Sequence, residues 1–228
     1  MKTTPFNLVI FDCDGVLVES EPLATQVLVQ ILAERGIKVN YEEFLREFSG
    51  AVIYKRLEAI SQKLNWTPPS NFISIFDERL SVLTEKELKP VPGIQALLES
   101  LSVPACVASN GSRDEIILRL KIAGLTEYFG KAIFSGLEMP HPKPAPDVFL
   151  AAAEAFKAAP DRCIVIEDTV LGVTAAVRAG MRVYGHAAFT TSESLKAAGA
   201  IPFDNMTELK LLLSDVSFEN IDSRHIVR

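Results

Sequence analysis

Two aspartates, Asp12 and Asp14, interrupt an apolar run in the stretch FDCDGVLV. Further polar side chains follow other apolar runs or lie beside them: Ser109, Asn110, Lys143, Glu167 and Asp168. Taken singly, each has an ordinary structural explanation as a turn, a loop or a helix cap. Such side chains can do chemistry together only if the fold brings the ends of these runs to one place.

The acids have an electrostatic consequence. If the runs that end at Asp12 and at Glu167 are close in a sheet, the carboxylates of both runs converge. Two unit charges about 4 Å apart repel by roughly 4 kcal/mol at an effective dielectric near 20, and the whole stability of a protein is only about 5–15 kcal/mol. The acids therefore hold protons or surround a cation. A few carboxylates with water suit Mg²⁺, and Mg²⁺ suits phosphoryl chemistry.

The elements that would position these residues follow from the hydrophobic pattern. Nearly continuous apolar runs predict buried strands, and helical patterns separate them. The expected strands are 7–11, 105–109, 163–167 and 182–185, with a weaker one at 131–135, and the expected helices are 93–101, 112–124, 146–158, 170–180 and 209–215. Ser112 and Glu115 have the spacing of a capping box, and Pro146 suits a first helical turn. This alternation predicts an α/β fold with a doubly wound parallel sheet, which binds ligands at the carboxyl ends of its strands.

Residues 19 to about 89 contain helical patterns and no strand pattern, which indicates an inserted all-α unit. These patterns cover 21–36, 41–49, 51–65 and 71–88, and KPVPG at 89–93 is typical of a return linker. We therefore predict a core of residues 1–16 and 90–228 and an inserted helical domain of residues 17–89.

Composition excludes several classes. The chain has 228 residues, 48% apolar, with a net charge of −6, which disfavours a nucleic-acid binder. No apolar run is long enough to span a membrane, and the N-terminus has no signal-peptide pattern. The three cysteines fit neither a disulfide framework nor a zinc site. We predict a cytoplasmic protein with reduced thiols, favoured as a monomer, whose partner is a small molecule.

Four stretches in order resemble the motifs of the haloacid dehalogenase-like (HAD) hydrolase superfamily, in its phosphatase and β-phosphoglucomutase-like branch. They are FDCDGVLVES, VASN, KPAPD and IEDTVLG. The resemblance covers essentially the whole chain. It implies a Rossmann-like core, a helical cap domain and Mg²⁺-dependent hydrolysis of a small phosphorylated metabolite, such as a sugar or sugar-acid phosphate.

The resemblance also implies roles for the catalytic residues. Asp12 would be the nucleophile that forms an aspartyl-phosphate, and Asp14 would be the general acid and then the general base. Lys143 would stabilise charge on the transferring group. Ser109, with Asn110 beside it, would bind the phosphoryl oxygens.

The same resemblance implies a magnesium site. Asp12, the backbone carbonyl of Asp14 and Asp168 would bind the ion, with Glu167 close by or linked through water. Gly15 would let the chain turn sharply toward the cap.

Four alternatives remain open, one of which is a non-catalytic structural relative, disfavoured because all the motif residues are present. A phosphosugar mutase of this branch carries a cap histidine and a cap arginine, and the corresponding places here are Ala24 and Ile53, which favours hydrolysis unless Lys55 or Arg56 replaces that arginine. A metal-free dehalogenase would leave the second acid and the Glu167–Asp168 pair idle. A phospho-accepting receiver module would be about half this length and would leave the helical insertion unexplained.

Substrate choice is expected to lie in the inserted domain. The candidates in REFSGAVIYKR are Arg46, Ser49, Tyr54 and Lys55. Arg46 or Lys55 could accept an acidic sugar phosphate. His141 is close to Lys143 in sequence, but we expect it to be a solvated surface residue.

Overall fold

The computed structural model of the chain describes residues 5–48 and 53–219. The chain is divided into two compact units. Met1–Val18 and Pro90–Arg228 form the first, which we call the core unit, and Glu19–Lys89 form the second, which we call the helical unit.

A six-stranded parallel sheet forms the centre of the core unit. Its strands are β1 (Leu8–Phe11), β2 (Ala105–Ser109), β3 (Ile133–Ser135), β4 (Cys163–Glu167), β5 (Arg182–His186) and β6 (Ile201–Phe203). Their order is β3-β2-β1-β4-β5-β6, and every pairing is parallel. The chain thus moves outward from β1 in both directions, which confirms the predicted doubly wound sheet.

The sequence pattern did not predict β6. This strand has three residues, includes Pro202 and pairs with β5 alone. Ile201 is 42% exposed. A short edge strand that contains proline has neither the apolar run nor the alternation on which strand prediction depends.

Helices connect the strands of the core unit. They are α5 (Ile94–Ser100), α6 (Arg113–Ile122), α7 (Thr126–Phe129), α8 (Asp147–Ala155), α9 (Val170–Arg178), α10 (Ser192–Ala198) and α11 (Met206–Ser214), with 3₁₀ turns η1 (Gly136–Glu138) and η2 (Pro160–Arg162). The predicted capping box of Ser112 and Glu115 is present at the start of α6. Pro146 is the N-cap of α8 rather than a residue of its first turn. The short helices α7 and α10 were not predicted.

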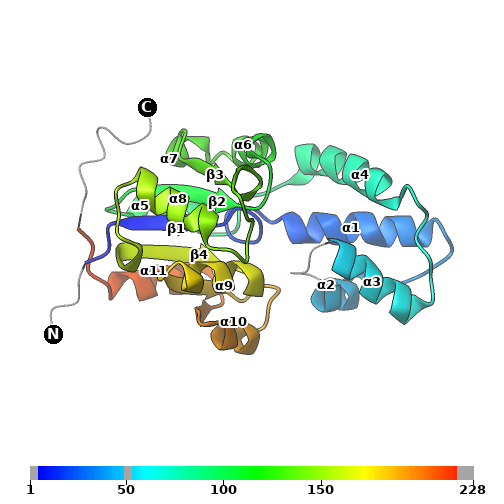
Figure 1. Cartoon of the computed structure of the whole chain (residues 1–228). Helices are drawn as coiled ribbons and strands as arrows, with labels where there is room; N and C mark the ends of the chain where they lie inside the picture. The colour runs from blue at the N-terminus through cyan, green and yellow to red at the C-terminus, as the bar shows by residue number, and fades with distance from the viewer. Residues whose placement is uncertain (1–4, 49–52, 220–228) are drawn as a thin grey trace. The chain divides into compact units, whose positions relative to one another are not determined.

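Both faces of the sheet are covered, as Figure 1 shows. Leu8 and Ile10 of β1 belong to a core cluster with residues of α8 and α9. Phe11 points to the opposite face, where its ring packs edge-on against Phe129 of α7. All four residues of β1 are fully buried. The strand that leads into Asp12 is therefore packed on both sides.

The helical unit contains α1 (Ser20–Ala33), α2 (Tyr41–Phe48), α3 (Ile53–Leu64) and α4 (Phe72–Glu87). It has its own apolar core, which includes Val27, Leu28, Ile31, Phe44, Ile60, Phe72 and Phe76. Buried Arg56 of α3 forms an ion pair with Glu21 of α1 at 2.7 Å. In the part of the chain that the structure describes, no helix could cross a membrane.

Candidate active site

The pairing of β1 with its neighbours brings the predicted site residues of three strands together. Phe11 is in register with Ile166 of β4 and with Val107 of β2, and Asp12 N donates to the Ile166 carbonyl at 2.9 Å. Asp12, Ser109 and Glu167 therefore lie at the same carboxyl edge of the sheet. The condition on which the expected cluster of acids depended, neighbouring strands at 7–11 and 163–167, is confirmed.

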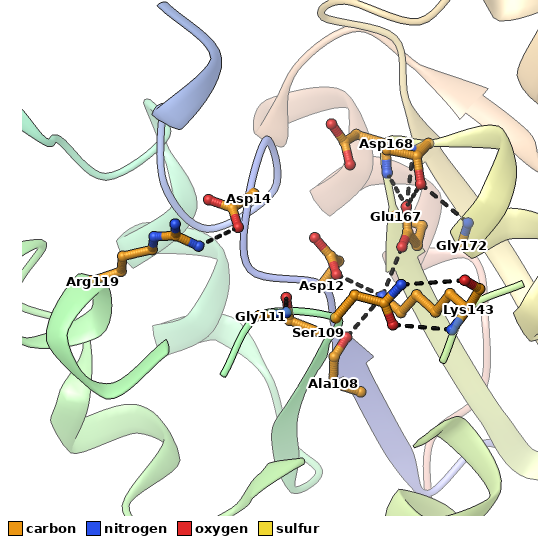
Figure 2. Close-up of polar contacts among 12 residues, drawn as sticks. Asp12, Asp14, Ala108, Ser109, Gly111, Arg119, Lys143, Glu167, Asp168 and Gly172 are labelled. Carbon is orange, nitrogen blue, oxygen red and sulfur yellow. Dashed lines mark hydrogen bonds and ion pairs between the residues drawn. The ribbon is translucent and has the colours of Figure 1, made fainter. Parts of the chain in front are cut away.

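Lys143 lies at the centre of this edge (Figure 2). Its ammonium group is 2.5 Å from Asp12 Oδ1, 2.8 Å from Glu167 Oε1 and 2.9 Å from the carbonyl oxygen of Ala108. Its side chain is 4% exposed, and the ammonium also lies 4.7 Å from the centroid of the Phe149 ring. One buried cation thus holds two buried carboxylates against the end of β2.

Asn110 fixes the segment that carries Lys143. Its Oδ1 accepts a hydrogen bond from Lys143 N at 3.0 Å, and its Nδ2 donates to the Lys143 carbonyl at 3.2 Å. The loop after β2 and the segment around Lys143 are thereby joined. The side chain of Asn110 therefore positions the backbone of Lys143.

Burial and charge act in opposite directions on the central pair. Burial, together with the charges of Glu167 and Asp14, raises the pKa of Asp12 to about 7 against the lowering effect of Lys143. Burial alone would lower the pKa of Lys143, but Asp12 and Glu167 raise it above its ordinary value. Lys143 therefore keeps its proton, whereas Asp12 is the acid of this cluster whose charge depends on what else binds beside it.

Glu167 has partners for both of its oxygens. While Oε1 accepts from Lys143, Oε2 accepts from Asp168 N and Thr169 N at 2.8 Å each and from Thr169 Oγ1 at 3.0 Å. The carboxylate also fills the place of a side chain at Gly172, where an added Cβ would lie 1.6 Å from Oε1. Glu167 is thus an anchor of Lys143 and of the start of α9.

The loop after β1 carries Asp14 and Gly15. Gly15 has a φ of 74°, and a Cβ there would lie 2.0 Å from Asp168 Oδ2, so the carboxylate of Asp168 packs directly against this loop. Asp14 Oδ2 is 2.6 Å from Arg119 Nη1, and Asp14 Oδ1 is buried and has no hydrogen-bond partner among the described residues. Burial would lower the pKa of Arg119, but Asp14 and other neighbours raise it, so the guanidinium stays charged.

Oxygen donors at this loop suit a hard cation. The possible ligands here are all oxygens, from the carboxylates of Asp12 and Asp168 and from the backbone carbonyls between Asp12 and Gly15. Because Gly15 has no Cβ, the carboxylate of Asp168 can pack directly against this loop. Among residues 5–48 and 53–219, no group of three or more His, Cys, Asp or Glu side chains is arranged to hold a metal. A cation here would therefore draw on two carboxylates, a carbonyl and water, which is how proteins commonly hold Mg²⁺. The residues fit the ion.

Ser109 and Gly111 form the corner after β2. Ser109 is buried, and its Oγ accepts a hydrogen bond from Gly111 N at 3.2 Å. Ser135 of β3 donates from Oγ to the Gly111 carbonyl at 2.6 Å. The corner is therefore rigid, and it lies beside Asp12 at the sheet edge (Figure 2).

The residues predicted to select the substrate belong to the helical unit. Arg46 of α2 and Tyr54 and Lys55 of α3 are exposed, Tyr54 by 69%, and Ser49 lies outside the described residues. In the core unit, the side chain of His141 is exposed, as expected.

Two residues of the site were not singled out from the sequence. Arg119 lies on a helix rich in charges, where a lone arginine is most often a surface residue. His186 ends β5, is buried, and donates from Nδ1 to the Gly15 carbonyl at 2.7 Å. Its polar character at the carboxyl end of a strand was the available signal.

Comparison with known proteins agrees with this geometry. The profile of the haloacid dehalogenase-like hydrolases matches residues 6–180. A 6-phosphogluconate phosphatase of Escherichia coli (strain K12) is 28% identical over 202 residues, which cover 88% of this chain and 91% of that protein. A phosphorylated carbohydrates phosphatase of Thermotoga maritima is 30% identical over 215 residues, 91% of this chain and 98% of that one.

A solved structure shares the fold over nearly the full length. It is a HAD family hydrolase from Deinococcus radiodurans R1 with bound phosphate and sodium, with a TM-score of 0.81 and 31% identity, covering 95% of this chain and 100% of that one. The chain therefore belongs to the haloacid dehalogenase-like hydrolases. Within that family it is an enzyme of the phosphatase kind.

Proposed function

We propose that this enzyme hydrolyses a small sugar or sugar-acid phosphate through a phosphorylated Asp12. The observation that carries the proposal is the position of Lys143, buried between Asp12 and Glu167 at the end of β1. Because Asp12 Oδ1 is held by Lys143, the carboxylate has a defined direction. Figure 2 shows its other oxygen pointing away from Lys143, toward the side where Asp14 and Asp168 lie.

The reaction has two transfers. An oxygen of Asp12 attacks phosphorus, the bond from phosphorus to the leaving oxygen breaks, and Asp14 gives that oxygen a proton. Water then attacks the aspartyl-phosphate, Asp14 takes a proton from this water, and inorganic phosphate leaves with Asp12 regenerated. Lys143 and the corner at Ser109 supply positive charge and hydrogen bonds to the phosphoryl oxygens.

The proposed cofactor is Mg²⁺, held by Asp12, the backbone carbonyl of Asp14 and Asp168. When bound, it neutralises charge on the phosphoryl group. Glu167 contributes by anchoring Lys143, because both of its oxygens already accept hydrogen bonds, and it would lie close to the ion or be linked to it through water.

Relatives named for phosphorylated carbohydrates and for 6-phosphogluconate support a substrate of this class. The helical unit acts as the cap in this proposal, with Arg46, Ser49, Tyr54 and Lys55 as the residues that meet the leaving group. Hydrolysis is favoured over mutase chemistry, because Ala24 and Ile53 stand where a mutase has its histidine and arginine. The burial of Arg56 in an ion pair with Glu21 argues against its replacing that arginine.

The three cysteines, Cys13, Cys106 and Cys163, are buried free thiols. This supports our proposal that the protein works in a reducing compartment such as the cytoplasm.

A phosphate-release assay on a panel of phosphorylated sugars and sugar acids tests the function. We expect turnover with Mg²⁺, loss of turnover with EDTA, and recovery on adding Mg²⁺ back. Asp12→Asn should abolish turnover, because an amide cannot attack phosphorus. Full activity in this variant or in EDTA would contradict the proposal, and transfer of phosphate within the sugar without release would instead support a mutase.

A further inference from the structure

Arg119 reaches the loop after β1 from a helix that carries none of the recognised motifs. Its Nη1 lies 2.6 Å from Asp14 Oδ2, although 105 residues separate them in the chain. The side chain of Arg119 is 18% exposed and that of Asp14 is 35% exposed. The pair is therefore partly shielded from water. In such a site a charge-assisted hydrogen bond restricts a side chain more strongly than it does at an open surface.

The fold gives Arg119 a fixed position. Its helix, α6, starts directly after the corner of Ser109 to Gly111 and is capped by Ser112 and Glu115. Arginine side chains in a helix lean toward its N-terminus, so Arg119 reaches back along α6 toward that corner. The Gly111 position confirms this direction, because a Cβ added there would lie 3.6 Å from Arg119 Nη1. Figure 2 shows the guanidinium opposite Lys143, on the far side of Asp14.

The two oxygens of Asp14 are consequently in different situations. Oδ2 faces Arg119, whereas Oδ1 is buried and has no hydrogen-bond partner within residues 5–48 and 53–219. A carboxyl group that gives a proton to a leaving oxygen and later takes one from water is effective only when its orientation is fixed. A guanidinium suits this task, because it binds a carboxylate and does not itself exchange protons at ordinary pH.

We propose that Arg119 is a positioning residue for Asp14, which holds Oδ2 and thereby fixes the orientation of the carboxyl group that exchanges a proton with the leaving group. The proposal rests on the acid and base role of Asp14 in the proposed function. It assigns Arg119 no contact with the substrate. An arginine that bound the phosphate directly would be the competing explanation, since Arg119 is also close to the corner at Gly111.

The dependence on the leaving group separates these explanations. An alkyl phosphate needs a proton on its departing oxygen, whereas the p-nitrophenolate of p-nitrophenyl phosphate departs without one. We would measure kcat/KM for both substrates with Arg119→Met, Arg119→Lys and Asp14→Asn. Arg113→Met is the matched control, since Arg113 is on the same helix and forms an exposed ion pair with Glu138.

We expect Arg119→Met to lower kcat/KM for the sugar phosphate by about 10- to 100-fold, and to change it by less than about threefold for p-nitrophenyl phosphate. The loss should lie in kcat rather than KM. Arg119→Lys should recover part of it, because an ammonium restores the charge without the fork of the guanidinium. Arg113→Met should leave both substrates unaffected, and thermal melting should show that each variant is folded.

Equal losses on both substrates, or a loss confined to KM, would overturn the proposal in favour of phosphate binding or a general structural role. Unchanged activity on both would overturn it as well. Asp14→Asn distinguishes this failure from failure of the function. If Asp14→Asn is selective for the sugar phosphate and Arg119→Met is not, only the role of Arg119 is wrong. If Asp14→Asn shows no selectivity, the acid role of Asp14 fails and the inference falls with it.

Discussion

Lys143 Nζ lies 2.5 Å from Asp12 Oδ1 across 131 residues of sequence. Both side chains are buried, so neither charge is compensated by water. The pair therefore determines the direction of the carboxylate that we propose as the nucleophile, and it makes the centre of the site sensitive to the loss of one cation.

Replacing that cation should damage both activity and stability. In Lys143→Met, Asp12 and Glu167 face each other without compensation, and the loss of one member of a buried ion pair costs about 3–5 kcal/mol. We expect kcat to fall by about 10²- to 10³-fold, as for the loss of one electrostatic donor at a reacting group. Phosphate release and urea unfolding measure the two effects. Lys143→Arg keeps the charge and should lose less stability; activity within tenfold of the original in Lys143→Met would contradict the assignment.

Magnesium binding should depend on pH through Asp12. Its pKa in the folded protein without metal is about 7, above the ordinary value of 3.8, so this group contributes stability that is present below about pH 4 and is lost as the pH rises toward about 7. Mg²⁺ must displace the proton from Asp12. The rise in melting temperature on adding Mg²⁺ should therefore be larger at about pH 8 than at about pH 5.5.

A matched variant tests the source of that pH dependence. Asp12→Asn has no proton to release at this position. Its response to Mg²⁺ should be small and nearly the same at both pH values. An equally steep response in Asp12→Asn would mean that another group controls binding.

Gly15 should be essential for the Asp168 carboxylate. Gly15→Ala forces a side chain onto a φ of 74° and places its Cβ 2.0 Å from Asp168 Oδ2. Gly124→Ala is the control, because Gly124 has a φ of 70° and, in the described part of the chain, nothing lies within 4 Å of a Cβ added there. Both variants should lose about 1–3 kcal/mol from backbone strain. Only Gly15→Ala should also bind Mg²⁺ more weakly in calorimetry, and equal Mg²⁺ affinity in both would contradict the role of Asp168.

His186 should stabilise the loop after β1 by a single hydrogen bond. It donates to the Gly15 carbonyl at 2.7 Å while its ring stacks on Phe203. His186→Phe keeps an aromatic ring but removes the donor, which should cost about 1–3 kcal/mol in unfolding free energy. Chemical denaturation measures this loss. An unchanged unfolding free energy would show that the carbonyl finds another partner.

The exposed cations of the helical unit should distinguish acidic from neutral sugar phosphates. Arg46→Ala and Lys55→Ala should raise KM for a sugar-acid phosphate by about tenfold, the effect of losing one charged hydrogen bond, and leave KM for a neutral sugar phosphate within about twofold. Lys63→Ala is the control, since Lys63 is exposed on the same unit and pairs with Glu47. Equal KM changes for both substrates would remove these residues from the specificity role.

Sequence by itself determined the layered architecture and the order of the site residues. Strands such as β2 and β4 are buried on both faces, so their apolar runs are continuous and their ends are visible. The capping box of α6 is equally local, since Ser112 and Glu115 satisfy backbone groups three residues apart. Local rules were too weak at short elements such as α7, α10 and β6.

Tertiary structure alone decided which side chains meet. Arg119 and Asp14 are 105 residues apart, and His186 and Gly15 are 171 apart. Nothing in the neighbourhood of either residue in the chain indicates its partner. These contacts arise because parallel pairing aligns the carboxyl ends of β1, β2, β4 and β5, and because packing of α6 against the core sets where a long side chain ends. Hydrophobic periodicity indicates which residues of one helix or strand are buried, whereas the site is formed by contacts between side chains of different helices, strands and loops.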